Sequence, residues 1–158
     1  MKKTILSILT LLFVSSCAFA DDSTEALKFF NSYVDAANNY SPEVAEKYSP
    51  NAKIIRQVIK PDGTTVNVET DTATYIKQMK IGQAGAKLRK YKNNYTNIVV
   101  TPLANNSYKV SSLRQPSGED YKLKTYMVVT KQPNNKWLIT EELMQTKVQT
   151  FLRYADKK

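Results

Sequence analysis

Few side chains in this sequence could carry out chemistry, because histidine is absent and cysteine occurs once. The one cysteine among the 158 residues is Cys17. Zinc sites built from cysteine or histidine, Ser-His-Asp triads and Cys-His pairs are therefore excluded. No segment has the alternating acidic pattern of a calcium-binding loop. The sequence predicts neither a metal site nor a bound cofactor.

Arg56, Tyr33 and one of two adjacent glutamates, Glu141 or Glu142, remain as candidates for a polar site. A guanidinium offers a planar fork of donors to an anion, and a tyrosine hydroxyl adds another donor. The structural alternative is that Arg56 lies on an exposed strand face or pairs with a glutamate. Trp137 and some of the ten tyrosines are candidates for an aromatic wall, although such residues more often serve as core and sheet-face residues.

Basic residues give the chain a formal net charge of +9 and gather in its middle. They are Lys77, Lys80, Lys87, Arg89, Lys90, Lys92, Lys109, Arg114, Lys122, Lys124 and Lys131. The functional interpretation is attraction to an anionic lipid surface or to an acidic envelope protein. The alternative is that these side chains line solvated faces and keep the protein soluble. Nucleic acid is not an expected partner, because the chain begins with an export signal.

That signal occupies residues 1–20. Lys2 and Lys3 precede an apolar run over 5–14, and Ala18-Phe19-Ala20 forms a small-x-small cleavage site. The run is too short for a membrane-spanning helix, which needs about 20 apolar residues. We therefore predict a signal peptide over 1–20, a single domain over 21–158, and a periplasmic or secreted location.

A second interpretation of the same segment is a lipoprotein signal. Val14-Ser15-Ser16-Cys17 resembles a lipobox, in which the cysteine becomes the lipidated first residue of the mature chain. Cys17 would then be a lipidation site, and the protein would be anchored to a membrane leaflet. Cleavage after Ala20 remains the first expectation, because that site is well formed.

Hydrophobic periodicity and turn signals predict helices first and strands afterwards. Ser23 is a candidate N-cap for a first helix to about residue 39, and Ser41-Pro42 begins a short second helix. The spacing of apolar residues in the first helix predicts one buried face, made of Ala26, Phe30, Tyr33, Val34 and Ala37. Strands at 52–60 and 64–69 form a hairpin that turns at Pro61-Asp62-Gly63. A third helix is expected from residue 72 to 80, ended by Gly82 and Gly85. Four long strands then follow at 89–102, 108–115, 121–131 and 137–146. The expected fold is α+β, a curved antiparallel sheet packed against about three helices.

Strand alternation and helix periodicity select the pocket candidates. In strand 121–131 the residues Leu123, Thr125, Met127 and Val129 share the face opposite two lysines, so this face is the covered one. In the last strand each face carries one glutamate, and alternation alone does not say which face is inside. The candidates for ligand binding are Phe30, Tyr33, Arg56, Thr125, Met127, Trp137 and Glu141.

The element order resembles that of the nuclear transport factor 2-like superfamily, which includes ketosteroid isomerase and cyclases of the SnoaL type. Three stretches carry the resemblance. They are the aromatic helix around Phe30-Asn31-Ser32-Tyr33, the capped turn Asn38-Asn39-Tyr40-Ser41-Pro42-Glu43, and the strand entry Tyr48-Ser49-Pro50-Asn51-Ala52. The resemblance implies a cone-shaped sheet with a pocket at its open end. It also implies that a homodimer through the sheet is to be expected.

The resemblance does not extend to all of the catalytic residues of the isomerases. Tyr33 matches their oxyanion-binding tyrosine, but the position of their catalytic carboxylate falls on or next to Arg56. A guanidinium stays protonated near neutral pH and cannot act as a general base. Dehydratase members depend on histidine, which this chain lacks. We therefore predict no catalytic residue.

The function that these observations favour is an exported, non-catalytic domain that binds a small apolar or anionic ligand or a protein partner. Two alternatives stay open. One is an isomerase or cyclase that uses a displaced carboxylate, Glu141, Glu142 or Asp71, as its base. The other is a structural component of a secretion or conjugation assembly in the cell envelope, where the lysine-rich face would matter.

Overall fold

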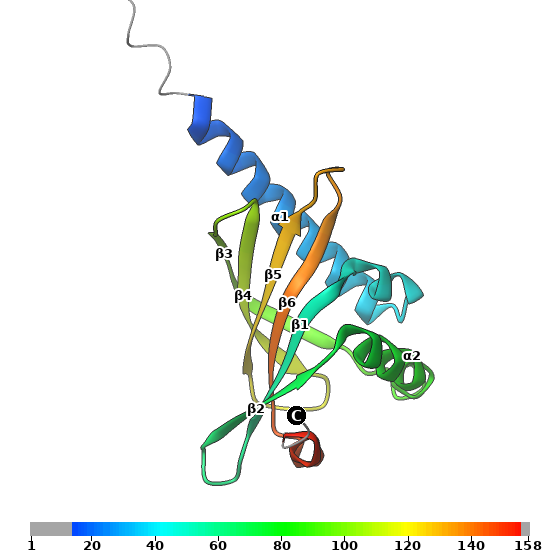
Figure 1. Ribbon diagram of the computed structural model, residues 1–158. Coiled ribbons are helices and arrows are strands. Elements are labelled where there is room, and N and C mark those ends of the chain that lie inside the picture. The colour runs from blue at the N-terminus through cyan, green and yellow to red at the C-terminus, as the bar shows by residue number, and fades with distance from the viewer. Residues whose placement is uncertain (1–13, 156–158) are drawn as a thin grey trace, which may run out of the picture.

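The computed structural model describes residues 14–155, which form helices packed against one sheet (Figure 1). In chain order the elements are α1 (Val14–Asn38), the 3-10 helix η1 (Pro42–Lys47), β1 (Tyr48–Ile59), β2 (Thr65–Thr70), α2 (Thr72–Leu88), β3 (Asn93–Pro102), β4 (Ser107–Pro116), β5 (Leu123–Lys131), β6 (Trp137–Thr146) and the 3-10 helix η2 (Gln149–Tyr154). The charged start and most of the apolar run of the predicted signal lie outside the described residues. No helix in the described part of the chain is long and apolar enough to cross a membrane.

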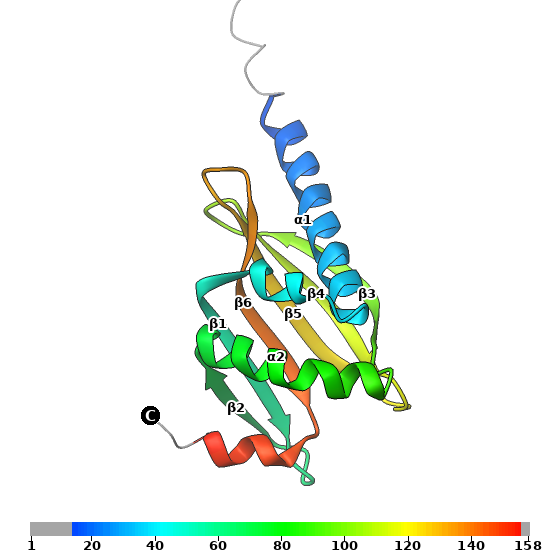
Figure 2. The same cartoon turned by 90° about the vertical axis from the view of Figure 1, so that its right-hand side faces the viewer.

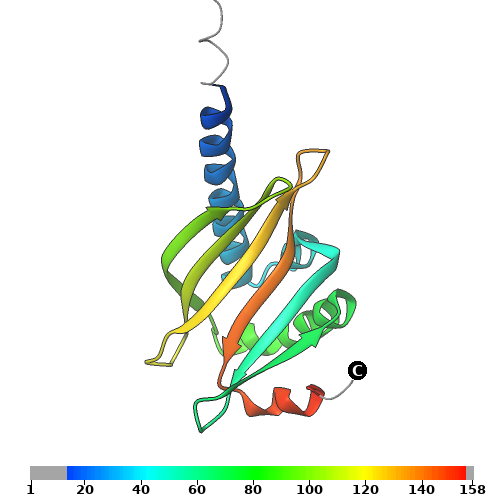
Figure 3. The same ribbon diagram turned by 60° about the vertical axis from the view of Figure 1, so that its left-hand side comes forward.

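The six strands form a single curved sheet in the order β2-β1-β6-β5-β4-β3. Neighbouring strands are antiparallel except β1 and β6, the second and third strands in this order, which run parallel. The helices α1, η1 and α2 lie on one face of the sheet (Figure 2), and they are behind it when the sheet is viewed from the other side (Figure 3). The predicted α+β fold with a curved sheet is confirmed, with one parallel pair added.

Helix α1 packs on the sheet through the apolar face that its sequence predicts. Ala26 is fully buried, and Phe30 and Tyr33 are nearly so. The Phe30 ring meets the Tyr95 ring of β3 edge-on, with 5.5 Å between ring centroids. The predicted start at Ser23 is wrong, because the helix continues back to Val14. A serine inside a helix costs little helix stability, so α1 continues through Ser23 to the residues that precede it.

The connection from α1 to the first strand follows its sequence signals. Ser41 caps η1 by accepting a hydrogen bond from the backbone N–H of Glu43 at 3.3 Å, and Pro42 occupies the first turn. The strand that follows is longer than predicted, because β1 begins at Tyr48 and already pairs with Ile139 of β6 there. Tyr48 thereby comes to lie inside the fold, with 5% of its surface exposed.

Helix α2 corrects the prediction that Gly82 and Gly85 end the third helix. Asp71 caps it through the backbone N–H of Thr74 at 2.8 Å, and the helix runs on to Leu88. Glycine costs a helix about 1 kcal/mol relative to alanine, but it keeps both backbone hydrogen-bonding groups. Two glycines therefore weaken α2 without breaking it, and α2 crosses the concave side of the sheet as one rod (Figure 2).

Candidate functional site

A cavity of ≈ 370 Å³ lies between the end of α1, helix α2 and the concave face of the sheet. Five tyrosines and three arginines contribute to its wall, together with methionine, alanine, valine and small polar residues. No aspartate or glutamate lies among its described lining residues. The cavity is therefore aromatic and apolar with cationic groups, which is the composition of a pocket for a small ligand rather than of a metal site.

A buried ion pair supports one wall of the cavity. Glu142 of β6 is completely buried, and its Oε1 lies 3.1 Å from Nη1 of Arg56 of β1. The hydroxyl of Tyr48 donates a hydrogen bond to Oε2 of the same carboxylate. The Arg56 guanidinium also lies over the Tyr75 ring, 4.7 Å from its centroid. Arg56 lines the cavity but already has its counter-ion and a stacking partner.

Three tyrosine hydroxyls extend this network. The Tyr48 hydroxyl lies 3.3 Å from that of Tyr33 and 3.5 Å from that of Tyr75. A hydroxyl has one hydrogen, and a carboxylate only accepts, so the Tyr48 hydrogen serves Glu142 and the other two hydroxyls can donate to Tyr48. Burial, together with the negative charge of Glu142, raises the pKa of Tyr33, Tyr48 and Tyr75 above the ordinary value. The three therefore stay protonated at neutral pH.

Arg114 of β4 is the second cation of the cavity, and its situation is different. It is 4% exposed, and its partners are the Asn93 side-chain oxygen at 2.8 Å, the Gln145 backbone carbonyl at 2.8 Å and the Tyr91 hydroxyl at 3.4 Å. Its Nε–H is buried and has no hydrogen-bond partner. Within residues 14–155 no carboxylate pairs with Arg114, so it is a buried cation whose partners are all neutral.

The loop after α1 also contributes a strained residue to the wall. Tyr40 has φ 58°, a left-handed conformation that is uncommon for a bulky aromatic residue. Its buried hydroxyl finds no hydrogen-bond partner among the described residues, and its carbonyl accepts from the Gln83 amide of α2. Strain of this kind persists where the surrounding structure fixes the backbone, and here the α2 contact supplies that constraint.

The structure brings together only part of the predicted site. Tyr33 and Arg56 lie together in the cavity wall, as their residue types suggested. Phe30, Thr125 and Met127 are buried but do not line the cavity. Phe30 and Met127 belong to the hydrophobic core, and the Thr125 hydroxyl donates to the Leu143 carbonyl at 2.8 Å. These three residues are packing residues beside the site.

Trp137 and Glu141 lie elsewhere. The Trp137 ring packs edge-on against Tyr108 at 5.8 Å between centroids, in a separate shallow hollow. Glu141 lies on the outer face of the sheet and accepts a hydrogen bond from Tyr126 at 2.6 Å. The register of β5 and β6 shifts between Val128 and Val129, so Ile139 and Glu142 both point inward. Simple alternation groups Ile139 with Glu141 and misses this bulge.

Arg114 and Asn93 are the functional candidates that the sequence analysis missed. A signal for Arg114 exists, because Tyr108, Val110, Ser112 and Arg114 alternate along β4 and are all buried. An arginine that continues an inward-facing apolar series is a candidate for a buried cation. Asn93 has no such signal: its side chain is fixed by distant contacts, and its backbone N–H donates to Asn38 at 2.9 Å.

Comparison with known proteins identifies the fold but no close relative. No protein-family model matches the chain, and no curated protein matches it. Among solved structures, a domain of unknown function with a cystatin-like fold from Nostoc punctiforme superposes with a TM-score of 0.56 at 18% identity, covering 84% of each chain. A protein of unknown function from Pectobacterium atrosepticum gives 0.59 at 16% identity, covering 80% of this chain and 91% of that one.

A third solved structure carries the name of the superfamily that the sequence resembles. It is a nuclear transport factor 2-like protein of unknown function from Shewanella oneidensis, with a TM-score of 0.56 and 16% identity over 80% of this chain and 98% of that one. Identities this low say nothing about activity. The curved six-stranded sheet, the helices on its concave side and these superpositions together show that the chain has the nuclear transport factor 2-like fold.

Proposed function

We propose that this protein binds a small amphipathic anion, a molecule with an apolar body and a carboxylate or similar headgroup, in the cavity beneath α2. The observation that carries this proposal is Arg114, a buried cation with only neutral partners in the wall of a ≈ 370 Å³ cavity. Taking a charge out of water is costly unless an opposite charge replaces the solvent. An anionic headgroup in the cavity would supply that charge.

The charge balance of the wall points the same way. Arg56 is neutralised by Glu142, whereas the buried Arg114 and the exposed Arg89 at the rim have no carboxylate partner within residues 14–155. The rest of the wall, including Met79, Ala86 and the ring of Tyr95, suits an apolar body. A cavity of this size is within the range of pockets for small molecules, about 300–1,000 Å³.

None of the three carboxylates that are candidates for the base of an isomerase-type mechanism is placed to act on a ligand in the cavity. Glu142 is enclosed by Arg56 and Tyr48 and is not part of the cavity wall. Glu141 lies on the outer face, and Asp71 is the exposed N-cap of α2, where hydrogen bonds from Thr74 lower its pKa. A general base must reach the proton that it removes, and none of these three side chains lines the cavity.

Substituting Arg114 by glutamine tests the proposal. We expect the wild-type protein to bind decanoate more tightly than decanol, and Arg114→Gln to weaken decanoate binding by roughly 10- to 100-fold, the equivalent of a lost hydrogen bond to a charged group. Decanol binding should change little, because it does not need the cation. Isothermal titration calorimetry at one fixed salt concentration measures both ligands.

Two controls define the result. Arg89→Gln, at the exposed rim of the same cavity, should reduce decanoate affinity only slightly, and a circular dichroism melt should show that Arg114→Gln is folded. Equal binding of decanoate and decanol by the wild-type protein, or an equal loss of both in Arg114→Gln, contradicts the anion site.

Export is the second part of the proposal, and residues 1–20 support it. Asp22, just after the predicted cleavage site, forms an ion pair with Lys131 of β5 at 2.7 Å, so a chain cut after Ala20 keeps this contact between α1 and the sheet. We expect intact-mass analysis of protein from a periplasmic fraction to give a chain that begins at Asp21. A chain that begins with lipidated Cys17 would instead show the lipoprotein alternative, and a cytoplasmic full-length chain would contradict export.

A further inference from the structure

The outer side of α2 exposes large apolar side chains that no described residue covers. Ile81 is 73% exposed and Leu88 is 86% exposed. They are seven residues apart, so they lie on the same side of the helix. The opposite side of α2 lines the cavity through Met79, Gln83 and Ala86. Ile81 and Leu88 therefore point away from the body of the protein.

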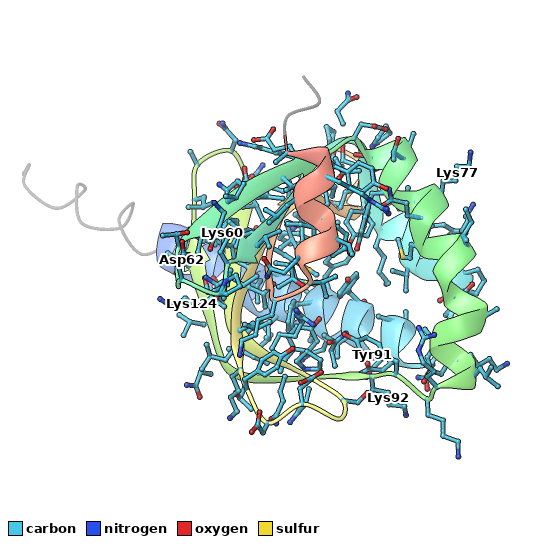
Figure 4. The ribbon with its side chains drawn as sticks, turned by 90° about the horizontal axis from the view of Figure 1, so that it is seen from below. Lys60, Asp62, Lys77, Tyr91, Lys92 and Lys124 are labelled. Atoms are coloured by element: carbon cyan, nitrogen blue, oxygen red, sulfur yellow. The ribbon has the colours of Figure 1, made fainter. Side chains whose placement is uncertain are left out.

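The surroundings of these two side chains are strongly basic. Lys77, Lys80 and Lys87 are exposed on α2, and Arg89, Lys90 and Lys92 follow directly after it. From residue 72 to residue 118 the sequence contains no aspartate or glutamate. In Figure 4, Lys77 and Lys92 extend outward at the two ends of this region. The result is an apolar pair among basic side chains, in a stretch of sequence that contains no acidic residue.

We propose that the outer face of α2, defined by Lys77, Lys80, Ile81, Lys87 and Leu88, docks on an acidic lipid bilayer. The lysines would meet the headgroup phosphates, and Ile81 and Leu88 would enter the boundary between headgroups and acyl chains. An amphipathic helix that combines basic residues with exposed aliphatic ones binds membrane interfaces in this way. The proposal concerns this outer face alone and does not depend on what the cavity binds.

The chemistry of this face argues against other occupants. A second copy of the chain would place one set of lysines against another, and like charges repel. A folded partner needs a complementary surface of about 800 Å² per side, whereas two separate aliphatic side chains form a small apolar area. A fluid bilayer needs no shape complementarity, and its affinity for a helix grows with the apolar area that enters it and with attraction between basic residues and anionic lipid. A small apolar area among lysines therefore fits a bilayer better than it fits a folded partner.

Co-sedimentation with vesicles of phosphatidylcholine, with or without phosphatidylglycerol, tests the docking. We expect the full chain to partition onto the acidic vesicles and to be released by salt. Ile81→Ser/Leu88→Ser should reduce partitioning by about tenfold, because two aliphatic side chains no longer leave water. Lys80→Gln/Lys87→Gln should reduce partitioning by roughly 30-fold, because each lysine contributes about 1 kcal/mol to the attraction.

Matched controls carry equivalent changes elsewhere on the surface. Val99→Ser/Leu103→Ser removes two exposed apolar side chains near β3, and Lys60→Gln/Lys124→Gln removes two lysines from the side of the molecule opposite Lys77 (Figure 4). Both controls should bind vesicles like the wild-type protein. The apolar run at residues 5–14 is the same in every variant, so its own affinity for lipid cancels in the comparison.

Three results would overturn the inference. Unchanged partitioning of both α2 variants would show that the N-terminal segment, or nothing, binds lipid. A loss in the lysine variant without a loss in the serine variant would show attraction by charge alone, with no insertion of α2. A wild-type dimer that Ile81→Ser/Leu88→Ser converts to a monomer, with unchanged vesicle binding, would show that a second copy covers this face.

Discussion

Replacing Arg56 with methionine is expected to lower the free energy of unfolding by about 3–5 kcal/mol, the usual cost of removing one partner from a buried ion pair. Glu142 is 0% exposed, and Arg56 is its only ion-pair partner among residues 14–155. Without the guanidinium, the carboxylate keeps only the hydroxyl of Tyr48. Methionine can still pack against Tyr75, so the lost stability comes mainly from removing the charge and only in small part from lost packing.

Urea unfolding of Arg56→Met measures this effect, and a second substitution shows its origin. Arg56→Met/Glu142→Leu removes both charges, and buried ion pairs replaced by apolar residues often lose little stability. The double variant should therefore be clearly more stable than Arg56→Met alone. If the single variant unfolds at the same urea concentration as the wild-type protein, the pair does not support the cavity wall.

Much of the fold could be predicted from residue pattern and turn chemistry. The buried face of α1, the cap at Ser41 and the hairpin at Pro61-Asp62-Gly63 follow local rules, and the structure shows each of them. The errors concern features that depend on packing between elements rather than on local sequence. Gly82 and Gly85 are unfavourable in a helix by an amount that packing of α2 on the sheet can offset, so they do not end it.

Less of the site could be predicted, because its geometry depends on pairings between distant strands. Tyr33 of α1 and Arg56 of β1 are 23 positions apart, and they line one cavity only because the fold brings α1 and the sheet together. The choice between Glu141 and Glu142 depends on a register shift in the β5–β6 pair, and a bulge leaves no clear mark in the sequence. Arg114 was accessible to alternation in β4, but alternation applied only to the strands 121–131 and 137–146 does not reach it.

Glu142 and Arg114 contribute to the proposed ligand binding in different ways. Glu142, Arg56 and Tyr48 satisfy one another, so this part of the wall holds its shape with or without a ligand. Arg114 is held in place by Asn93 and the Gln145 carbonyl, yet neither neutralises it. A preorganised cation in an apolar cavity lowers the cost of binding an anion, because little has to move when the anion arrives.

Alkaline pH is expected to unfold this protein in a narrow range above pH 10, because four tyrosines lie inside the fold in their protonated form. Tyr33 and Tyr48 are buried, and Tyr75 and Tyr95 are half-buried. Burial is the main cause that raises the pKa of Tyr33, Tyr48, Tyr75 and Tyr95 in the folded state. In the unfolded chain they ionise near pH 10. Below that pH their contribution to stability is fully present, and it is lost as the pH rises from the unfolded value toward the folded one.

The slope of this loss follows from proton linkage. Above pH 10 the unfolded chain holds fewer protons than the folded protein, so each buried tyrosine lowers the free energy of unfolding by about 1.4 kcal/mol per pH unit. Four of them give about 5.6 kcal/mol per pH unit, which is comparable to the whole stability of many domains. Absorbance at 295 nm should therefore show a group of tyrosines that ionises together with the loss of circular dichroism.

Removing one of these tyrosines distinguishes the effect of tyrosine ionisation on stability from a general effect of high pH. Tyr33→Phe should reduce the slope of stability against pH above pH 10 by about 1.4 kcal/mol per unit, because one ionising group has gone. Tyr154→Phe, on the exposed C-terminal turn, is the matched control. Ionisation of all ten tyrosines near pH 10 with the circular dichroism intact would mean that water reaches the hydroxyls around Glu142, and the cavity wall would then be open rather than closed.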